Sequence, residues 1–316
     1  MNLKFAESLE VFVDVFRARS FSEVARRRGL VASSVARQVD ALEGELGVSL
    51  FTRSTRALAP TEAGERLFER AVRILHDLRE ARSEVTAIEQ GVHGLLRLSC
   101  LPAFARRHVL PWLGDFNDRY PGIRIELDLT ERIVDPVVER VDLVLRVGQQ
   151  PDSSLVGQRL GTHRYLMCAA PAYLARHGEP TCLAELDGHR LIDRRHSTSM
   201  RGWRELIGTP RAACAPSFVL ECDDCDARRL AVIQGLGIAL MPNWSVGAEV
   251  ASGTLREIAL SDVAPLPPSG IYALRALPRA SARIRAFTDY LAAKLAAYEA
   301  ASEPLGAASA PAYALS

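Results

Sequence analysis

Residues 31–43 read VASSVARQVDALE, and this spacing predicts a helix with two different faces. Val35, Val39 and Leu42, followed by Leu46, recur at intervals of four and three residues, so they share one buried side. The polar residues lie away from that stripe, in pairs one turn apart: Ser33, Ser34, Arg37 and Gln38. From the residues alone, the polar face is either a solvated surface or a surface that binds another molecule.

The residues before this helix predict two more helices. The first has a buried stripe at helical spacing: Leu9, Phe12, Val13 and Phe16. Ser22 is the expected N-cap of a short second helix through Arg28, which Gly29 then ends. Ala25, four residues before that glycine, lets the neighbouring helix approach closely. Two helices joined by a tight glycine turn are typical of a helix-turn-helix, whose second helix projects its outer face.

The side chains on that outer face are ones that can read DNA. Arg37 can bond guanine bidentately and Gln38 can do the same with adenine. Ser33 and Ser34, near the helix N-terminus, suit phosphate or base contacts. Residues 17–58 contain eight arginines and four acidic residues, whereas the whole chain has a net charge of only +1. This local excess is compatible with nucleic acid, and equally with solvated surface.

A short hairpin and a long helix are expected next. Residues 48–60 combine β-branched residues with two arginines and a terminating proline, and Thr61 is placed to cap the helix that follows. Apolar residues then repeat as a heptad: Leu67, Ala71, Ile74, Leu78, Ala81, Val85 and Ile88. Because the other faces are strongly charged, we expect this seam to pair with a second copy of the helix. The alternative is a helix that packs along its own domain.

After residue 91, short strand-like runs alternate with helical segments. The expected strands cover residues 95–100, 123–130, 142–147, 164–170, 218–222, 238–242 and 271–276. Strands separated by helices favour an α/β fold with mainly parallel sheets. A last helix is expected over 282–300, and the small, Pro- and Ala-rich residues 301–316 are expected to be a disordered tail.

Four motifs in the first 66 residues form a specific combination. They are F-S-x-x-A-R-R-x-G at 21–29, S-x-V-x-R-Q-V-x-x-L-E-x-E-L-G-V-x-L-F at 33–51, R-x-x-R at 53–56 and T-E-A-G at 61–64. Together they closely resemble the DNA-binding region of LysR-type transcriptional regulators. The resemblance implies an all-α winged helix-turn-helix at 1–62 and a linker helix at 63–90 that pairs two subunits. The DNA-binding residues it implies are Ser22, Ser33, Ser34, Arg37, Gln38, and Arg53 and Arg56 in the wing.

Three positions depart from the family pattern. Val31 stands where the family usually has Ser or Thr at the start of the recognition helix, and it cannot accept a capping hydrogen bond, which costs roughly 1 kcal/mol. Ala36 stands where Ser is frequent, which removes a candidate phosphate contact. Arg28 stands where the family often has an apolar residue. These departures bear on base preference rather than on the match itself.

The resemblance continues more diffusely through residues 95–295. Its pieces include L-R-L-S at 96–99, D-L-x-L-R-x-G at 142–148, PAYLARHGEP at 171–180 and G-L-G-I-A-x-x-P at 235–242. They imply an effector-binding domain at 91–300 with two α/β subdomains, like a periplasmic binding protein. Subdomain I would comprise 91–162 and 271–300, and subdomain II 163–270.

In such a fold, strand C-termini and helix N-termini line a ligand cleft. The residues at those positions are Ser99, Cys100, Leu101, Pro102, Thr130, Arg132, Arg146, Trp203, Asp223, Asp224 and Cys225. Trp203 is as consistent with core as with the cleft wall. Residues 221–226 read ECDDCD, and these four acids disfavour an anionic ligand unless Arg132 or Arg146 dominates. The charge of the effector is left open.

Cys222-x-x-Cys225 invites a redox or metal interpretation. A thiolate at the start of a helix would have a lowered pKa, whereas the nearby acids would raise it. A zinc site needs about four ligands, and the sequence has no second CxxC. Structural cysteines, thiol sensing by Cys222 and Cys225, and metal binding all remain alternatives. No Gly-rich phosphate loop, nucleophile elbow or metal triad is present, so an enzyme is not expected.

The prediction is therefore a LysR-type regulator that binds double-stranded operator DNA as a dimer or tetramer. It would respond to an unknown small-molecule effector and need no cofactor or metal, with RNA polymerase as a candidate partner. The N-terminus lacks the apolar run of a signal peptide, and the most apolar later stretch is broken by glycines, so a cytoplasmic protein without membrane contact is expected. A metabolite-binding protein or enzyme without DNA contact is the remote alternative.

Overall fold

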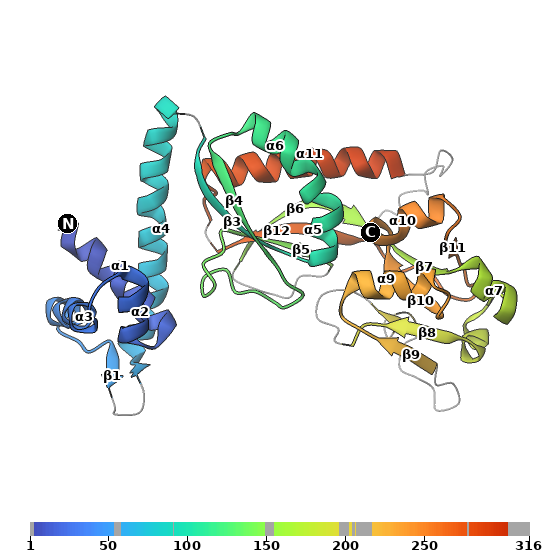
Figure 1. The fold of residues 1–316 in the computed structure, drawn as a ribbon, viewed down its shortest axis with the longest axis horizontal. Helices are drawn as coiled ribbons and strands as arrows, with labels where there is room; N and C mark the ends of the chain where they lie inside the picture. Colours follow the sequence, from blue (N-terminus) through green and yellow to red (C-terminus); the bar gives the residue numbers. More distant parts are fainter. Residues whose placement is uncertain are drawn as a thin grey trace, which may run out of the picture. The chain divides into compact units, whose positions relative to one another are not determined.

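The computed structural model describes residues 3–53, 58–90, 92–148, 155–195, 202–203, 206, 217–276 and 278–302. The chain divides into two compact units, Met1–Gly91 and Val92–Ser316 (Figure 1).

The described residues of unit 1 form four helices and one hairpin. They are α1 (Leu3–Ala18), α2 (Phe21–Arg28), α3 (Ala32–Leu46), β1 (Phe51–Arg53), β2 (Leu58–Pro60) and α4 (Glu62–Gln90). The two strands pair antiparallel, which confirms the predicted hairpin. An aromatic cluster joins these elements, because Phe16 stacks on Phe68 of α4 with ring centroids 4.0 Å apart and Phe12 lies against Phe51 of the hairpin. The core therefore holds the base of the hairpin and the start of α4 against α1.

The helix ends of unit 1 follow the expected chemistry with one correction. Gly29 ends α2 at φ 67°, in the left-handed region that glycine adopts most readily. Thr61 caps α4 as predicted, accepting a hydrogen bond from the N–H of Gly64 at 3.1 Å. The cap of α2, however, is Ser20 and not Ser22: Ser20 has extended dihedrals and its Oγ accepts from the N–H of Glu23 at 3.2 Å. Ser22 lies one residue inside the helix.

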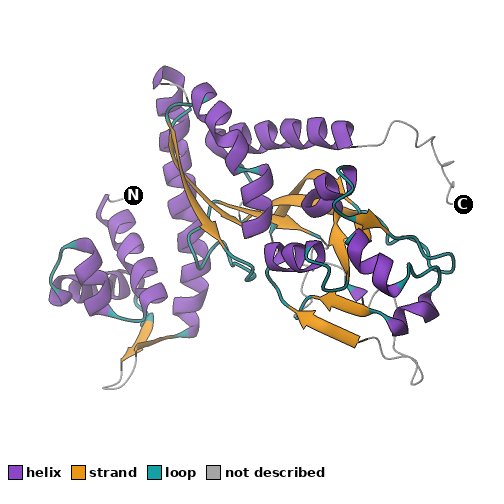
Figure 2. Ribbon diagram, turned by 45° about the vertical axis from the view of Figure 1, so that its right-hand side comes forward, coloured by secondary structure: helices purple, strands orange, loops and turns teal. Residues whose placement is uncertain are grey.

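In the part of unit 2 that the structure describes, the strands form two five-stranded sheets. The first has the order β4-β3-β5-β12-β6, built from β3 (Gly94–Cys100), β4 (Ile123–Leu129), β5 (Leu143–Val147), β6 (Val156–His163) and β12 (Ser269–Arg275). The second has the order β11-β7-β10-β8-β9, built from β7 (Tyr165–Ala169), β8 (Arg190–Asp193), β9 (Ser217–Glu221), β10 (Ile238–Pro242) and β11 (Arg256–Glu257). The strands of the two sheets form separate groups in Figure 2.

Helices connect the strands of unit 2. The described ones are α5 (Pro102–His108), η1 (Leu110–Trp112), α6 (Leu113–Arg119), α7 (Pro171–His177), η2 (Leu183–Gly188), α9 (Cys225–Ile233), α10 (Asn243–Ala251) and α11 (Ala282–Ser302). Helix α11 extends two residues into the predicted tail, and residues 303–316 lie outside the described part of the chain. None of the described helices is long and apolar enough to cross a membrane.

The sheets are mixed, which corrects the expectation of mainly parallel ones. Strands β3, β4 and β5 are parallel, as are β8, β9 and β10, but β12 runs antiparallel to both β5 and β6. In the second sheet β7 is antiparallel to β10. The reason is that the chain leaves the first sheet along β6 and returns along β12, so these neighbours run in opposite directions. Most buried apolar residues of both sheets form one continuous core, and Val144 of β5 and Leu274 of β12 pack with Val134 in a second, smaller cluster.

Candidate functional sites

Helix α3 separates its two faces largely as predicted. Val35, Val39 and Leu42 are buried against the rest of unit 1, while Arg37 is exposed. Leu46, predicted to continue the buried stripe, is 37% exposed at the last turn of the helix. The stripe therefore anchors α3 by three residues and leaves the opposite side free for contact with another molecule.

The four polar residues predicted on this face are not equally presented. Ser33 and Arg37 are exposed, and Ser34 is half-buried. Gln38 is also half-buried, and its Oε1 is buried without a hydrogen-bond partner in the described part of the chain. Arg37 thus projects more fully than Gln38, a difference that helical spacing alone could not show.

The start of α3 has no side-chain cap. Val31 occupies the N-cap position with extended dihedrals, φ −87° and ψ 146°, and makes no capping hydrogen bond. This confirms the consequence predicted for that departure from the family pattern. Arg28, another departure, has a structural partner, because its guanidinium bonds Asp14 of α1 with Nη2 to Oδ2 at 2.6 Å. An apolar residue at that position would lose this tie between α1 and α2.

The remaining predicted DNA-binding residues lie around α3. Ser22 is exposed near the N-terminus of α2. Arg53 ends β1, and the side chain of Arg53 and all of Arg56 lie outside the described residues. The two strands of the hairpin are described, and DNA contact by Arg53 and Arg56 stays a prediction.

The heptad of α4 is divided between two environments. Ala71 is fully buried within unit 1, and Phe68 and Leu75 share that core, so Ala71 is not part of an exposed seam. Leu67 is half-buried. Further along the helix, four residues of the heptad are exposed: Ile74 (44% of its surface), Leu78 (47%), Val85 (69%) and Ala81. The side chain of Ile88 lies outside the described residues. Packing within unit 1 accounts for Ala71, whereas pairing of the exposed residues Ile74, Leu78 and Val85 with a second copy of the helix stays a prediction.

Several of the predicted effector residues meet at strand ends of unit 2. Ser99 and Cys100 are buried at the end of β3, and Thr130 after β4 donates its N–H to the Cys100 carbonyl at 3.0 Å. Arg146 lies near the end of β5 and is only 7% exposed. Next to the second sheet, Cys225 is the first residue of α9 and is buried. Leu101 and Pro102 lead into α5 on the side of the first sheet.

Four ionisable side chains interact at these strand ends, and we call them the charged cluster: Glu131, Arg146, Arg194 and Arg228. Burial and the charge of Asp224 raise the pKa of Glu131, while Arg194, Arg228 and the backbone N–H of Cys225 act to lower it. Burial also lowers the pKa of Arg146 and of Arg228, and Glu131 opposes both shifts. Only Arg146 was among the predicted residues. The other three are single charged residues from separate segments, and no motif in the sequence marks them.

Two predicted effector residues lie outside this cluster. Arg132 is exposed and its Nη2 pairs with Glu139 Oε2 at 3.2 Å. It therefore does not supply the positive charge that could outweigh the acids of residues 221–226. Trp203 is fully buried and its indole N–H donates to the carbonyl of Ile192 at 2.9 Å. Trp203 is therefore a core residue, because a side chain with no exposed surface cannot form a cleft wall.

The acidic run at 221–226 is largely engaged. Asp224 caps α9 by accepting from the N–H of Ala227 at 2.9 Å. Asp226 pairs with Arg106 at 2.8 Å and with Arg107 at 2.6 Å, both on α5. Asp223, half-buried beside the cap, has interactions of its own. The negative charge that seemed to disfavour an anion is thus partly neutralised by residues more than a hundred positions away.

Among the described cysteines, Cys100, Cys168 and Cys225 are buried free thiols, and Cys182 and Cys222 are half-buried free thiols. Burial raises the pKa of Cys225, whereas the sequence sets lowering by the helix start against raising by the nearby acids, and its Sγ lies 3.4 Å from Ser245 Oγ. Burial raises the pKa of Cys100 strongly as well. Because thiolate is the reactive form, these two positions do not favour thiol sensing. Within the described residues, His, Cys, Asp and Glu form no group of three that could hold a metal ion.

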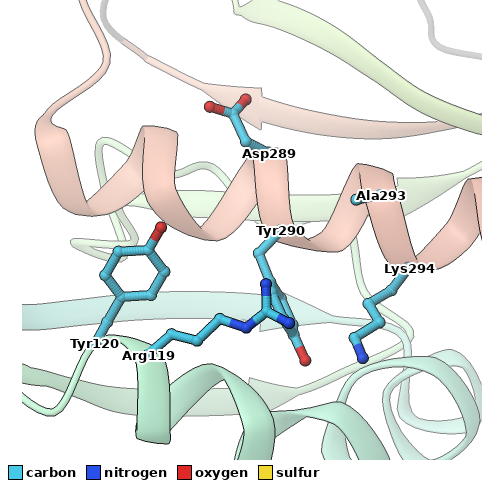
Figure 3. Close-up of a pocket in the computed structure, with 6 residues that line it drawn as sticks. All are labelled: Arg119, Tyr120, Asp289, Tyr290, Ala293 and Lys294. Atoms are coloured by element: carbon cyan, nitrogen blue, oxygen red, sulfur yellow. The ribbon is translucent and has the colours of Figure 1, made fainter.

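A separate hollow of about 430 Å³ lies between the end of α6 and α11 (Figure 3). Its lining residues are Arg119, Tyr120, Asp289, Tyr290, Ala293 and Lys294. Lys294 pairs with Asp115 at 2.8 Å, and Tyr290 donates its hydroxyl to the same carboxylate at 2.9 Å. None of the predicted effector residues lines this hollow, and its cations are already compensated.

Two family models match the chain. Residues 6–65 match the bacterial regulatory helix-turn-helix protein, lysR family, and residues 89–296 match the LysR substrate binding domain. The regulator CrgA of Neisseria meningitidis serogroup C is 32% identical over 294 residues, covering 92% of this chain and 97% of CrgA. The regulator DmlR of Escherichia coli K12 is 31% identical over 286 residues, covering 90% and 92% of the two chains.

The fold of the whole chain is also similar to a solved regulator. The structure of CrgA from Neisseria meningitidis aligns with a TM-score of 0.58 at 31% identity, covering 92% of this chain and 98% of CrgA. The two matched regions contain α3 with its exposed polar face and the two sheets with the charged cluster. The chain therefore belongs to the LysR family of transcriptional regulators, with a DNA-binding helix-turn-helix domain followed by an effector-binding domain.

Proposed function

We propose that this regulator reads its operator with the outer face of α3. The observation that carries the proposal is the exposure of Arg37 and Ser33 on a helix whose opposite face is fixed by a buried stripe. A rigidly held helix can place a guanidinium against a guanine edge, since direct readout depends on precise geometry. Gln38 would need to turn its buried amide outward, so we assign it a lesser part. Ser34, Ser22 and the wing arginines Arg53 and Arg56 would position the domain through phosphate or minor-groove contacts.

The proposed assembly is a dimer formed along α4. Ile74, Leu78 and Val85 expose apolar surface at helical spacing between charged residues, as expected for one half of a coiled coil. A two-fold dimer would present two α3 helices to a two-fold symmetric operator. In this arrangement residues 1–62 bind DNA, 63–90 link and pair the subunits, and 91–300 bind the effector in two subdomains divided as the sequence predicts.

The effector is proposed to bind between the two sheets of unit 2, where the strand ends carry the charged cluster. To act as a switch, it must bind one arrangement of the two subdomains more tightly than another. The same free-energy difference then changes the affinity for operator DNA, since coupling between two sites is reciprocal.

The DNA-reading proposal is tested on DNA selected from a random pool by the wild-type protein. We expect Arg37→Ala to weaken binding to the selected DNA by about 1–3 kcal/mol while leaving binding to random DNA much less affected. Arg256→Ala removes the same charge from an exposed position on β11 in unit 2 and is the matched control. If Arg37→Ala discriminated selected from random DNA as well as wild type, α3 would not be the reading helix.

A further inference from the structure

Residues 49–51 lead from α3 into the hairpin, and one carboxylate of α3 holds them in place. Glu43 accepts with Oε1 from the backbone N–H of Leu50 at 2.6 Å and from that of Phe51 at 3.1 Å. Leu50 and Phe51 are 1% and 4% exposed, so water has little access to these N–H groups. Because a buried donor without an acceptor is costly, this carboxylate fixes the start of β1 to the last turn of α3.

The start of α4 holds the same three residues through their carbonyl groups. The N–H of Thr61 donates to the Leu50 carbonyl at 3.0 Å, and its Oγ1 donates to the Ser49 carbonyl at 2.7 Å. Gly64, in the first turn of α4, lies so close that a Cβ at this position would overlap the Leu50 carbonyl oxygen. We call residues 49–51 the joint, because its N–H groups bond α3 and its carbonyls bond the start of α4.

The hydrogen bonds of the joint set an orientation that apolar packing would leave open. Phe51 packs in the aromatic cluster of unit 1, with its ring centroid 5.5 Å from that of Phe12. Apolar packing is non-directional, whereas a hydrogen bond requires a particular direction as well as a distance. The two bonds to Glu43 therefore determine how β1 is oriented against α3. DNA contact by α3 and the hairpin together needs such a fixed spacing, since readout depends on the geometry of the contacting elements.

We propose that Glu43 is a positioning residue for DNA binding, which acts by fixing the joint between α3, the hairpin and the start of α4. Its carboxylate touches the backbone of the joint and needs no contact with DNA. This inference rests on the proposed function, because α3 and the hairpin are the proposed DNA contacts and α4 is the proposed dimer helix.

The sign of the effect separates positioning from charge. Removal of a carboxylate near DNA tightens binding if charge alone matters, because the phosphates repel it. Loss of the positioned joint weakens binding instead. We expect Glu43→Ala to weaken binding of the full-length protein to the selected DNA about tenfold, at a temperature where circular dichroism shows it folded. Glu45→Ala is the matched control, because it removes the same charge from an exposed position of α3 and should not weaken binding.

Two conservative variants separate the acceptor from the charge. Glu43→Gln keeps an acceptor oxygen at the same reach without the charge, so it should bind DNA nearly as tightly as wild type. Glu43→Asp keeps the charge but is one methylene shorter, so it should weaken binding, and it replaces Glu43→Ala if that variant does not fold. Hydrogen–deuterium exchange of the peptide covering residues 49–53 should be faster in Glu43→Ala and Glu43→Asp than in wild type and in Glu45→Ala.

Three results would overturn the inference. They are unchanged or tighter DNA binding by folded Glu43→Ala or Glu43→Asp, an equal loss in Glu43→Gln, and unchanged exchange of the joint. Val13→Ala, at a buried position of α1, controls for lowered stability, and an equal loss of DNA binding in this folded variant would also reject positioning. Arg37→Ala is measured alongside. An effect of Arg37→Ala without one of Glu43→Ala rejects this inference alone, whereas the reverse result rejects only the DNA-reading proposal.

Discussion

The uncapped start of α3 allows a direct test of how the recognition helix is stabilised. Val31 has the extended backbone of an N-cap residue and its side chain is 65% exposed, so a smaller polar residue fits without loss of packing. In the same unit, Ser20 and Thr61 cap their helices by accepting from the N–H three residues later. At α3 the N–H of Ser34 donates to the Val31 carbonyl at 3.0 Å, so the hydroxyl of a serine at position 31 would have to share this donor or replace the carbonyl as its acceptor.

We expect Val31→Ser to stabilise the first turn of α3 by about 1 kcal/mol, the usual contribution of a side-chain cap. Such a change slows amide exchange through local opening by about fivefold, since 1.4 kcal/mol corresponds to a factor of ten. Hydrogen–deuterium exchange of the peptide covering residues 31–38 measures it in the full-length protein. Val31→Ala is the matched control, because it removes the same side chain without adding an acceptor. Equal exchange in Val31→Ser and Val31→Ala would refute the capping argument.

Three further outcomes are expected. Ile74→Lys combined with Leu78→Lys should convert the proposed dimer to monomer in light scattering, because four lysines would face one another across the proposed α4 seam; an unchanged mass would count against that seam. Burial lowers the pKa of His163 to about 4, so its neutral form stabilises the fold above pH 6.5. That contribution, about 3 kcal/mol, should be lost as the pH falls from 6.5 to 4, and urea titrations of His163→Gln should lack this part of the loss. Gly64→Ala should lower the free energy of unfolding by about 1–3 kcal/mol, because its Cβ would overlap a backbone carbonyl oxygen, whereas Gly44→Ala meets open space and should not.

The helix-turn-helix could be predicted from the sequence because the residues that define it lie close together in the chain. The spacing of Val35, Val39 and Leu42 predicts the buried face of α3, and Gly29 predicts the turn before it. These features depend on helical periodicity and on the left-handed conformation of glycine, which act within a few residues. The predicted cap of α2, Ser22, was wrong by two residues, since the helix begins at Phe21 and Ser20 caps it.

The sheets of unit 2 were harder to predict. Strands β6, β8 and β11 were missed. Strand β6 has two glycines and only two apolar residues in VGQRLGTH, and β8 and β11 have only four and two residues. The direction of β12 depends on how the chain crosses between sheets, which no local pattern encodes. For the same reason Trp203 could not be assigned from sequence, because only the folded core shows that it has no exposed surface.

The sequence by itself determined the family, the helix-turn-helix and the polar face of α3, because each depends on residues close together in the chain. Tertiary structure alone decided the charge of the candidate effector site. The acidic run at 221–226 suggested a negative wall, but Arg106 and Arg107 from α5 neutralise Asp226, and Arg194 and Arg228 add positive charge beside Glu131. Electrostatic interactions act through space, so the sign of a site is set by side chains that folding brings together from distant segments.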